Sequence, residues 1–563
     1  VQTCALPIWA VASTELGELT DRVRLIDDVL KGVPGCRALA GRRELTVAIE
    51  SRLERLETVV AEAEARLDAL EGDALEAASA AVMAARDAVW SIRRDRLGTA
   101  RAVAELAGQD AGAAALAGYL MIQQSLSVLD RLEVRGRDSA GIHLFVWNHG
   151  LSVDDPMVVA ALGSRGRDPL FRNRSVRWIE KNGVLSFVYK AAAEIGELGD
   201  NTRALRAAVA GDDLLRHALS GAEARTSLVG HTRWASVGII SEPNAHPVNS
   251  ELLEPAGEEY VIAALNGDID NHGDLRIEHD LRFATSITTD AKVIPSLVAR
   301  ARAGGIDDAE AFRRTVASFD GSVAIAAAAA ERPDRLLIAL RGSGQGLFVG
   351  LADDLWVVAS EPYGVVEETT RYLRLDGDSV AGAAKGQIVV LDAATAGTLA
   401  GIDRRSYDGT ALPVLESEIS SAEVTTRDID RGDAPHFLLK EITEAPQSLH
   451  KTLRGRITET DGLLRANLSE RTIPASIAGR LDQGRITKIR VIGQGTAAVA
   501  GRSCAGVLDE LCDGRLDVDA LTATELSGFG LRLDMSDTLV IAVSQSGTTD
   551  RKSTRLNSSH ANI

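Results

Sequence analysis

The sequence has few of the features that mark membrane, secreted or nucleic-acid-binding proteins. Aromatic residues make up only 4% of its 563 positions. No uncharged apolar run approaches the roughly 20 residues that a transmembrane helix needs, and the N-terminal stretch lacks the pattern of a signal peptide. Lysine and arginine number 62 against 80 acidic residues, a net charge of -18. Since phosphate backbones are bound through basic side chains, this balance argues against nonspecific nucleic-acid binding.

Cysteine is scarce as well, with four residues, Cys4, Cys36, Cys504 and Cys512. No pair has the CxxC spacing, so the cysteines indicate neither a zinc site nor a disulfide framework. Cys36 lies in a GVPGCR sequence that predicts a turn ahead of a helix. Cys504 and Cys512, eight positions apart on one helical face, are predicted to be small buried residues. We therefore expect a cytoplasmic protein.

The length of the chain is enough for about three or four domains. Apolar residues make up 45% and charged residues 25%, which is ordinary for a globular protein. The opening VQTCALPI and the tail RKSTRLNSSHANI (551–563) resemble translated linker sequence, and residues 1–12 and 551–563 are excluded from the fold prediction. We expect the chain to be a fragment of a longer protein, cut at both ends.

Residues 13–117 are predicted to be helical. Apolar residues recur at three- and four-residue steps with glutamate and arginine between them, at Leu45, Ile49, Leu53, Leu56, Val60, Ala63, Leu67 and Leu70. Gly72-Asp73 breaks this row, and a second helical pattern runs from Leu75 to about Arg96. The pattern predicts an αα-hairpin or small bundle. We expect these helices to be a structural or oligomerisation insert rather than a segment that carries catalytic residues.

A β-rich region follows a helix at 119–132. Strands are predicted at IHLFVWN, VLSFVYK, EEYVIAALNG, GSVAIAAAA, DRLLIALRG, GLFVGL and LWVVAS, with helices between Asp290 and Ser318. This domain extends over 118–412. A polar linker is predicted at 413–435. An α/β domain at 436–550 then opens with HFLLKEITEAPQSLHKTLRGRI (436–457). It continues with strand IRVIG, a glycine-rich turn, a helix and strand DTLVIAVS.

Four sequence blocks in the β-rich domain concentrate polar residues. They are LDRLEVRGRDSAGIHL at 129–144, GHTRWASVGIISEPNAHPVNS at 230–250, Asn266-Gly267 and Thr289-Asp290. Each has a simpler interpretation: Asn-Gly alone signals a hairpin turn, Asp290 alone an N-cap, and Arg233-Trp234 a stacked pair. His231 and His246 fit a hydrogen-bonded scaffold better than general bases. The order and spacing of all four blocks argue against coincidence.

Together these blocks resemble the class II, N-terminal-nucleophile glutaminase domain of the glutamine–fructose-6-phosphate aminotransferase (glucosamine-6-phosphate synthase) family. The resemblance implies a four-layer αββα sandwich with 13–117 as a helical insertion. It implies that Arg233 pairs with the α-carboxylate of glutamine, that Asp290 binds its ammonium group, and that Asn266 and Gly267 form an oxyanion hole. It places Arg135 beside the nucleophile, and Trp234 and Ser236 at the glutamine site.

Two departures from the family pattern bear on this site. The family's nucleophile is an N-terminal cysteine followed by Gly-Ile, whose α-amine acts as the base. Neither Cys4, followed by Ala-Leu, nor Cys36 matches it. The nucleophile is therefore expected on an N-terminal strand absent from this chain, which would leave the chain inactive. The family's TRWATHG also appears as TRWASVG, so that Val237 replaces an imidazole.

The C-terminal domain resembles the first half of a sugar isomerase (SIS) domain. Glycines at a strand-to-helix turn let backbone N–H groups face a phosphate, although GxG alone is a weak signal. By resemblance, the hydroxyls and amide that hold fructose 6-phosphate belong to Thr496, Ser544, Gln545, Ser546 and Thr549. The simpler interpretation is a serine-rich surface turn. The family's CGTS appears as QGTA, with Gln494 and Ala497 replacing a cysteine and a serine.

The resemblance implies a glutamine-dependent enzyme that makes glucosamine 6-phosphate from fructose 6-phosphate, without metal or organic cofactor. Its expected partners are L-glutamine and fructose 6-phosphate, with no nucleic acid or membrane and a homodimer through the SIS half of the parent. Two alternatives remain open. One is a non-catalytic sugar-phosphate sensor, favoured by Val237, Ala497 and the helical insertion. The other is a different class II amidotransferase, which the SIS-like half disfavours.

Overall fold

The computed structural model describes residues 5–70, 72–108, 110–192, 196–253, 259–342, 344–381, 384–432, 434–460, 462–466 and 473–544. The chain forms two compact units, 1–448 and 449–563. Helix α13 (Phe437–Leu453), at the start of the predicted SIS region, spans their boundary. Each unit is described by itself.

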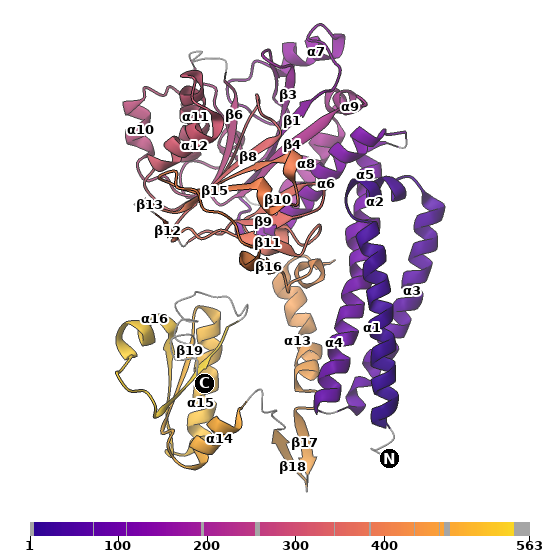
Figure 1. The fold of residues 1–563 in the computed structure, drawn as a ribbon, viewed down its shortest axis with the longest axis vertical. Helices are drawn as coiled ribbons and strands as arrows, with labels where there is room; N and C mark the ends of the chain where they lie inside the picture. The colour runs from indigo at the N-terminus through magenta and orange to yellow at the C-terminus, as the bar shows by residue number, and fades with distance from the viewer. Residues whose placement is uncertain are drawn as a thin grey trace. The chain divides into compact units, whose positions relative to one another are not determined.

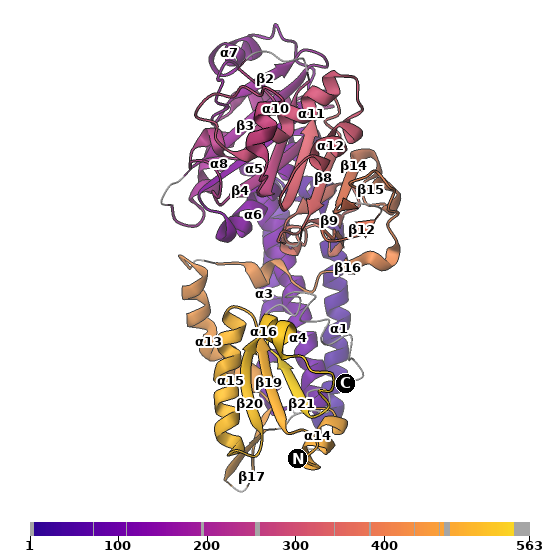
Figure 2. The ribbon, with the colours of Figure 1, turned by 90° about the vertical axis from the view of Figure 1, so that its left-hand side faces the viewer.

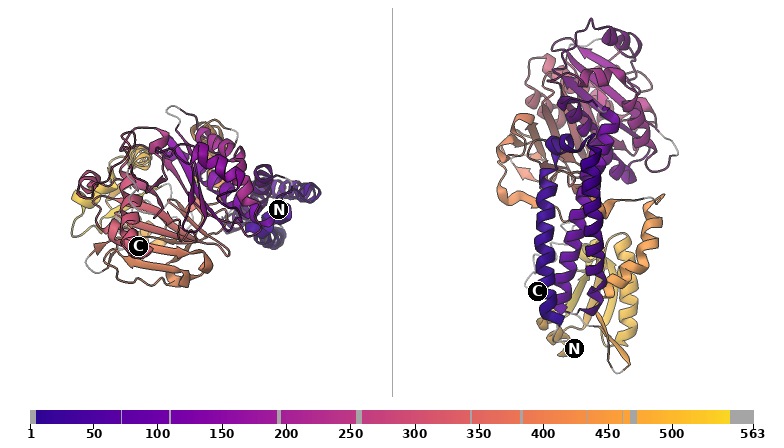
Figure 3. Two further views of the ribbon diagram at one scale, coloured as in Figure 1. Left: turned by 90° about the horizontal axis from the view of Figure 1, so that it is seen from above. Right: turned by 90° about the vertical axis from the view of Figure 1, so that its right-hand side faces the viewer.

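The first part of unit 1 is helical, as the apolar spacing predicts. Its elements are α1 (Ala5–Val29), α2 (Gly32–Leu39), α3 (Arg43–Ala65), η2 (Leu67–Ala69), α4 (Gly72–Trp90), the π-helix η3 (Ser91–Gly98) and α5 (Thr99–Ala107). The long helices α1, α3 and α4 lie side by side (Figures 1 and 3). Leu53, Val60 and Leu67 from the predicted row are buried, and Leu45 is exposed. Cys36 is buried inside α2, so the predicted turn is wrong.

A four-stranded antiparallel sheet, sheet A, follows the helix α6 (Ala113–Leu132). Its order is β2-β3-β1-β4, with bounds Val176–Ile179, Val184–Ala191, Ser139–Trp147 and Arg225–Arg233. Apolar residues of β1 and β3 form one core with the helices on the outer face of the sheet. These helices are α6, α8 (Asp200–Ala210) and α9 (Asp213–Leu219), and α7 (Pro156–Arg165) packs beside β2. Strand β4 is absent from the predicted strands, because the sequence RTSLVGHTR has no apolar run.

The second sheet, sheet B, has six strands in the order β15-β14-β8-β7-β6-β5. Their bounds are Ile402–Ser406, Gln387–Asp392, Arg335–Arg341, Val323–Ala329, Val261–Gly267 and Val248–Asn249. The outer face of sheet B packs on α10 (His272–Glu278), α11 (Val293–Ala303) and α12 (Asp308–Ala317). Phe145, Val188 and Val229 of sheet A meet Ile262 and Ala328 of sheet B in a core between the sheets. Helices therefore cover the outside of two stacked sheets, as the predicted four-layer arrangement requires.

A third sheet, sheet C, continues the layer of sheet A. It contains β10 (Trp356–Ala359), β9 (Phe348–Leu351), β11 (Arg371–Arg374) and β16 (Ile419–Ser421) in that order. Val349 and Leu373 of this sheet pack on Ile338 and Val389, on the face of sheet B turned away from α11 and α12. Among the described strands, β4 ends sheet A and β10 ends sheet C. Strand β16 lies in the stretch predicted to be a linker, which thus also contributes to a sheet.

Unit 2 contains a small parallel sheet with the order β20-β19-β21 (Figure 2). The strands span Asp517–Thr522, Lys488–Gly493 and Thr538–Ala542, and α15 (Thr496–Cys512) packs on them. The two predicted strands and the helix between them are confirmed, and β20 is additional. The predicted burial of Cys504 and Cys512 is wrong, since Cys504 is exposed and Cys512 half-buried. Only the opposite face of α15, with Ala498 and Ala505, is covered by the sheet.

The two faces of the outer helices give a direct test of this packing. Ile294 of α11 is fully buried, whereas Ile277 of α10 is 81% exposed. We expect Ile294→Ala to lower the free energy of unfolding of unit 1 by about 2–5 kcal/mol, because it leaves a cavity in the core. Ile277→Ala, the matched control, should change it by less than about 0.5 kcal/mol. Urea unfolding followed by circular dichroism measures both, and equal losses would contradict the assigned layers.

Candidate active site

A cavity of about 920 Å³ lies between sheets A, B and C. It is lined by every residue that the sequence predicted for the glutaminase site, namely Arg135, Arg233, Trp234, Ser236, Asn266, Gly267 and Asp290. These residues come from η4 (Glu133–Arg135) after α6, from the end of β4 and the loop after it, from the end of β6, and from η6 (Asp290–Lys292) ahead of α11. The fold therefore brings together side chains that lie up to about 155 positions apart in the sequence.

Arg233 is the last residue of β4, paired with Ser139 of β1, and is 3% exposed. The chain turns back after it, and the Arg233 guanidinium donates to the carbonyls of Val237 and Ile239, the latter at 3.3 Å. Burial lowers the pKa of Arg233, and the carboxylates of Asp290 and Asp138 oppose this shift. A guanidinium has five N–H donors, so two carbonyl contacts leave donors for a ligand carboxylate.

Asp290 supplies the opposite charge of the site. It begins the short helix η6 (Asp290–Lys292) and is 4% exposed. Its carboxylate accepts from the backbone N–H groups of Ile269 and Ala291, each at 2.9 Å. Burial raises the pKa of Asp290, and these two N–H groups oppose the shift. Asp290 is not the N-cap of α11, a position that Lys292 occupies.

Asn266 and Gly267 end β6 and do not form a hairpin turn, since β7 begins only at Val323. Gly267 has φ +110°, and a Cβ atom on it would lie 2.1 Å from the carbonyl oxygen of Ser322. Only glycine fits this position. The Asn266 side chain is exposed at the cavity. An amide donor and a glycine N–H at a strand end have the chemistry of an oxyanion hole.

The remaining predicted residues lie at the rim. Trp234 is 74% exposed while Arg233 is buried, so the two do not form a packed pair. The Ser236 hydroxyl donates to Asp268 at 2.6 Å. Arg135 forms an ion pair with Glu361 of sheet C's connecting loop, and its side chain is 66% exposed.

A scaffold of buried polar residues holds Asp290 in place. The Asn244 side chain accepts from the backbone N–H groups of Thr288 and Thr289, at 2.7 and 3.0 Å. His246 contacts the carbonyl of Leu265 at 3.1 Å and the Thr289 hydroxyl at 2.8 Å. Burial lowers the pKa of His246 well below its usual value, so the neutral ring donates to Leu265 and accepts from Thr289. The scaffold role predicted for His246 is confirmed.

Some residues of the site were missed by the sequence prediction. Asp138 accepts from the backbone N–H of Ala235 at 2.9 Å and is one of the two carboxylates that act on Arg233. Gln345, which lines the cavity, accepts from the Ser322 hydroxyl at 2.6 Å beside Gly267. Asp138 lies in the RGRDSAG block and had a sequence signal, whereas Gln345 lies in an unremarkable loop and had none.

Besides the predicted site residues, the cavity is lined by two edge strands, β4 and β10. We define the strand slot by residues 226–233 of β4, 355–360 around β10, and the floor residues Ala324, Ala326 and Ala328 of β7, with α6 above β4. The small side chains of the floor leave room above sheet B. Edge strands present unpaired N–H and C=O groups, so the strand slot offers backbone hydrogen-bonding groups along β4 and β10.

None of the three cysteines in the described ranges lines the cavity. Cys36 lies in α2, and Cys504 and Cys512 lie in unit 2. Cys4 falls outside the described residues. Among the residues that the structure covers, no group of three or more His, Cys, Asp or Glu side chains could hold a metal ion, and no helix is long and apolar enough to cross a membrane.

In unit 2, Thr496 and Ser544 lie at one edge of the parallel sheet. Thr496 begins α15 directly after β19, and Ser544 follows β21, the neighbour of β19. Both are exposed. A Cβ atom on Gly493 would lie 2.7 Å from the backbone of Ala497, so glycine is required where the strand meets the helix. The other predicted sugar-phosphate residues, Gln545, Ser546 and Thr549, lie outside the described residues.

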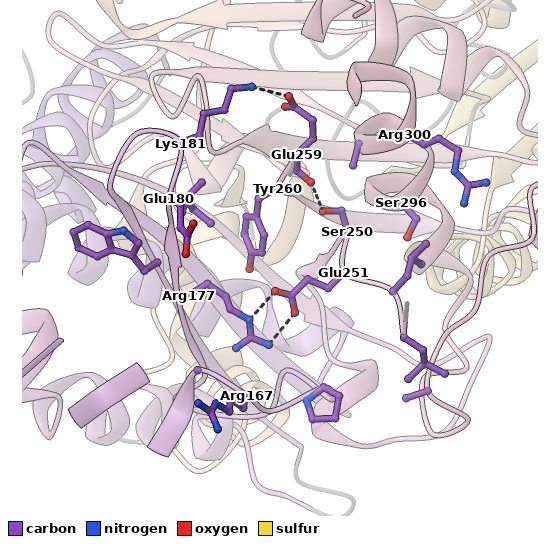
Figure 4. A pocket seen from close by; sticks show the side chains of 18 of the residues that line it. Arg167, Arg177, Glu180, Lys181, Ser250, Glu251, Glu259, Tyr260, Ser296 and Arg300 are labelled. Carbon is purple, nitrogen blue, oxygen red and sulfur yellow. Dashed lines mark hydrogen bonds and ion pairs between the residues drawn. The ribbon is translucent and has the colours of Figure 1, made fainter. Parts of the chain in front are cut away.

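A second cavity of about 720 Å³ lies on unit 1 near Tyr260 (Figure 4). Its main charged side chains are paired with one another. Arg177 forms a bidentate contact with Glu251, at 2.6 and 2.8 Å, and Lys181 pairs with Glu259 at 2.8 Å. These internal pairs leave this cavity a weaker ligand site than the first.

Comparison with known proteins confirms the predicted resemblance. Curated proteins named glutamine–fructose-6-phosphate aminotransferase [isomerizing] are 26% to 29% identical to this chain. The relative from Streptococcus pneumoniae strain R6 is 26% identical over 422 residues, 75% of this chain and 55% of the relative. The one from Symbiobacterium thermophilum is 29% identical over 446 residues, 77% of this chain and 58% of the relative. The one from Bacillus spizizenii is 29% identical over 321 residues, 57% of this chain and 47% of the relative.

The chain thus spans about half the length of the curated relatives it matches. No family model matches it. Two solved structures resemble it distantly, each 18% identical and covering 51% of this chain and 46% of the other. They are an allosteric regulatory enzyme of purine biosynthesis, with a TM-score of 0.32, and a glutamine phosphoribosylpyrophosphate amidotransferase from B. subtilis, with a TM-score of 0.31. A likeness of this size supports no further conclusion.

Two histidines that line the cavity, His231 and His246, predict how the stability of unit 1 depends on pH. The rings of His231 and His246 lie in a tilted contact with their centroids 4.8 Å apart, and burial lowers the pKa of His231 from 6.5 to about 4. Between about pH 6.5 and 4, His231 therefore binds a proton in the unfolded chain but not in the folded chain. As the pH falls through this window, proton binding favours the unfolded chain and lowers the free energy of unfolding. We expect His231→Asn to reduce this slope in urea unfolding measured from pH 7 to 4.

The control for this experiment is His450→Asn on the exposed helix α13. Buried carboxylates such as Asp290, whose pKa burial raises, give the free energy of unfolding the opposite dependence on pH. Subtracting the free energy of unfolding of the unmutated chain from that of each variant removes this contribution. An unchanged slope in His231→Asn would show that His231 is not held neutral by the fold.

Proposed function

We propose that the cavity of unit 1 binds L-glutamine and forms the glutaminase site of a glutamine-dependent aminotransferase. The observation that supports this most is the pair of buried opposite charges, Arg233 and Asp290, in one cavity with Asn266 and Gly267. A free amino acid carries a carboxylate and an ammonium group on one carbon. A guanidinium matches the carboxylate in bidentate geometry, and a buried carboxylate matches the ammonium group.

The side-chain amide of the bound glutamine then lies toward the end of β6. Attack on its carbonyl carbon puts negative charge on the carbonyl oxygen, and the Asn266 amide and the Gly267 N–H stabilise that charge. Because Gly267 is held in sheet B by its pairing with Val323 of β7, the donor is oriented before the reaction begins. Arg135, held by Glu361 at the rim, lies on this side of the cavity and offers further N–H donors.

The nucleophile is the part of the site that the described cysteines do not supply. We propose that a cysteine at the start of an extended segment reaches the cavity through the strand slot. Such a segment pairs with β4 and β10. Its first residue lies beside Asn266, at the end of the strand slot where β4 reaches Arg233. Its α-amine then acts as the base, as the resemblance implies.

For the whole protein we propose glucosamine 6-phosphate synthesis from fructose 6-phosphate and glutamine. In support, the curated relatives carry the aminotransferase name, and the parallel sheet of unit 2 carries Thr496 and Ser544 at the edge where such sheets bind ligands. Unit 2 would hold the sugar phosphate as the first part of an SIS domain, in a cytoplasmic and homodimeric parent. The sensor and the other amidotransferases are not favoured, because the curated relatives share neither name.

The carboxylate clamp is tested by Arg233→Lys. Replacing a bidentate guanidinium with a point charge should weaken L-glutamine binding about tenfold or more, because charge-assisted hydrogen bonds are worth roughly 1.5–3 kcal/mol. Isothermal titration calorimetry on the purified chain measures the dissociation constant. In a parent protein with the complete activity, the same change should spare ammonia-dependent synthesis. The control is Arg314→Lys on the outside of α12, where Arg314 pairs with Glu310 and its side chain is 59% exposed.

Equal loss of glutamine-dependent and ammonia-dependent synthesis would count against the clamp. So would an Arg233→Lys chain that binds glutamine as tightly as the control does.

The strand slot makes a separate prediction about activity. The purified chain should bind glutamine without releasing ammonia from it, because no described cysteine reaches the cavity. Adding a peptide of about nine residues that begins Cys-Gly-Ile should restore hydrolysis, and the same peptide beginning Ser-Gly-Ile should not. Ammonia release in a coupled assay measures both. Hydrolysis by the chain without peptide would refute the proposed source of the nucleophile.

A further inference from the structure

The helices of residues 5–107 contribute none of the predicted glutamine contacts, yet they reach the cavity. Val33 of α2 lines it. Gly32, with φ +62°, lies so close to the cavity residue Asp354 that a Cβ atom on it would be 2.8 Å from the Asp354 carboxylate. The helical part is therefore a direct neighbour of the site.

A buried arginine makes the strongest connection between the two. Arg96, in the π-helix η3, is 4% exposed. Its guanidinium donates to the Asp27 carboxylate at 2.9 Å, which ties it to α1. It also donates to the backbone carbonyl of Glu367 at 2.7 Å and to the Glu368 carboxylate at 3.4 Å. One side chain thus joins the helices to the loop between β10 and β11.

That loop forms one wall of the cavity. We define the wall segment as residues 361–369, of which Glu361, Gly364, Val365, Glu367 and Glu368 line the cavity. One end of the segment binds Arg135 through Glu361. The other end is where Arg96 attaches.

The sandwich holds the wall segment from the opposite side. Gln124 of α6 donates to Glu368 at 2.7 Å, and Arg131 of α6 forms an ion pair with Glu367. Thr99 of α5 donates to Glu367 at 3.1 Å. The two glutamates therefore accept from donors on both the helical part and the sandwich, which fixes the wall segment between them.

The charges at this contact do not balance unless protons are retained. Three cations, Arg96, Arg131 and Lys31 (3.7 Å from Asp27), face four carboxylates, those of Asp27, Asp95, Glu367 and Glu368. Burial and the neighbouring Glu367 raise the pKa of Asp95 to about 7, and burial raises that of Glu368 to about 7. Breaking a buried pair by removing one partner is costly, because it leaves a charge without compensation. Removing Arg96 therefore affects the glutamates of the wall segment directly.

The π-helix explains how Arg96 reaches this place. In η3 three successive residues, Asp95, Arg96 and Leu97, are buried, whereas an α-helix on a surface buries residues three or four positions apart. The wider turn lets Leu97 enter the helical core while Arg96 and Asp95 point toward the wall segment. Asp95 also accepts from the Thr426 hydroxyl at 2.7 Å. Such π turns often occur at functional positions.

We propose that Arg96 is a positioning residue for the glutamine site, and that the helices of residues 5–107 set the place of the wall segment through it. The link to the site is the wall segment itself, from Glu368 and Glu367 at Arg96 to Glu361 at Arg135. The expected effect of Arg96 on glutamine binding rests on the proposed glutaminase function. Its expected effect on the position of the wall segment rests on the contacts alone.

The experiment compares Arg96→Gln with Arg93→Gln by hydrogen–deuterium exchange and by glutamine titration. Arg93 lies in the same π-helix but pairs with Glu57 of α3 at 2.9 Å, away from the cavity. We expect Arg96→Gln to speed amide exchange in 361–369 about tenfold and to weaken L-glutamine binding about tenfold, while α1, α3 and α4 keep their protection. Arg93→Gln should change neither quantity.

A second variant covers the case in which Arg96→Gln does not fold. Glu368→Gln keeps the shape and an acceptor for Gln124, and it replaces the ionisable carboxyl that faces Arg96 with a neutral amide. It should raise exchange in 361–369 in the same direction, by a smaller factor.

Equal exchange of 361–369 in Arg96→Gln and Arg93→Gln would overturn the proposal. So would faster exchange of the wall segment with unchanged glutamine affinity, since the wall would then not position the site. If the unmutated chain binds no glutamine, the proposed function fails, and the expected effect of Arg96 on glutamine binding fails with it. The exchange data still decide whether Arg96 holds the wall segment.

Discussion

The structure depends on keeping two opposite charges buried in one cavity without letting them neutralise each other. Arg233 is held by the carbonyls of Val237 and Ile239, and Asp290 by the N–H groups of Ile269 and Ala291. Backbone dipoles thus offset the cost of burying each charge. Because the two groups are not consumed in a mutual ion pair, both remain available to a zwitterionic ligand.

The layers of the fold serve this arrangement. Sheet B is a continuous floor, whereas sheets A and C cover it from two sides and leave the strand slot between β4 and β10. Sheet A carries Arg233 at the end of its edge strand. The wall segment, in the loop between β10 and β11 of sheet C, contacts the helices of residues 5–107 through Arg96. The helical part, which resembles an appended bundle in sequence, therefore contacts the cavity at Val33 and through Arg96.

Much of the fold was predictable from apolar patterns. Strands β1, β3, β6, β7, β8, β9 and β10 all contain runs of apolar residues and were identified from them. Strand β4 was missed, since an edge strand beside a cavity need not be apolar on both faces. The burial predicted for Cys504 and Cys512 was wrong for a related reason. Helical spacing shows that two residues share a face, but it does not show which face meets a sheet.

By itself the sequence determined which residues could form a glutamine site, because Arg233, Asn266, Gly267 and Asp290 stand in motif blocks with recognisable order and spacing. It also determined the helical and strand segments that carry apolar runs. Only the tertiary structure decided that these residues share one cavity, that His246 and Asn244 hold Asp290, and that Arg96 contacts the wall segment. The physical reason is that burial, pKa and hydrogen-bond partners depend on neighbours more than 40 positions away in the chain, and no local pattern encodes those neighbours.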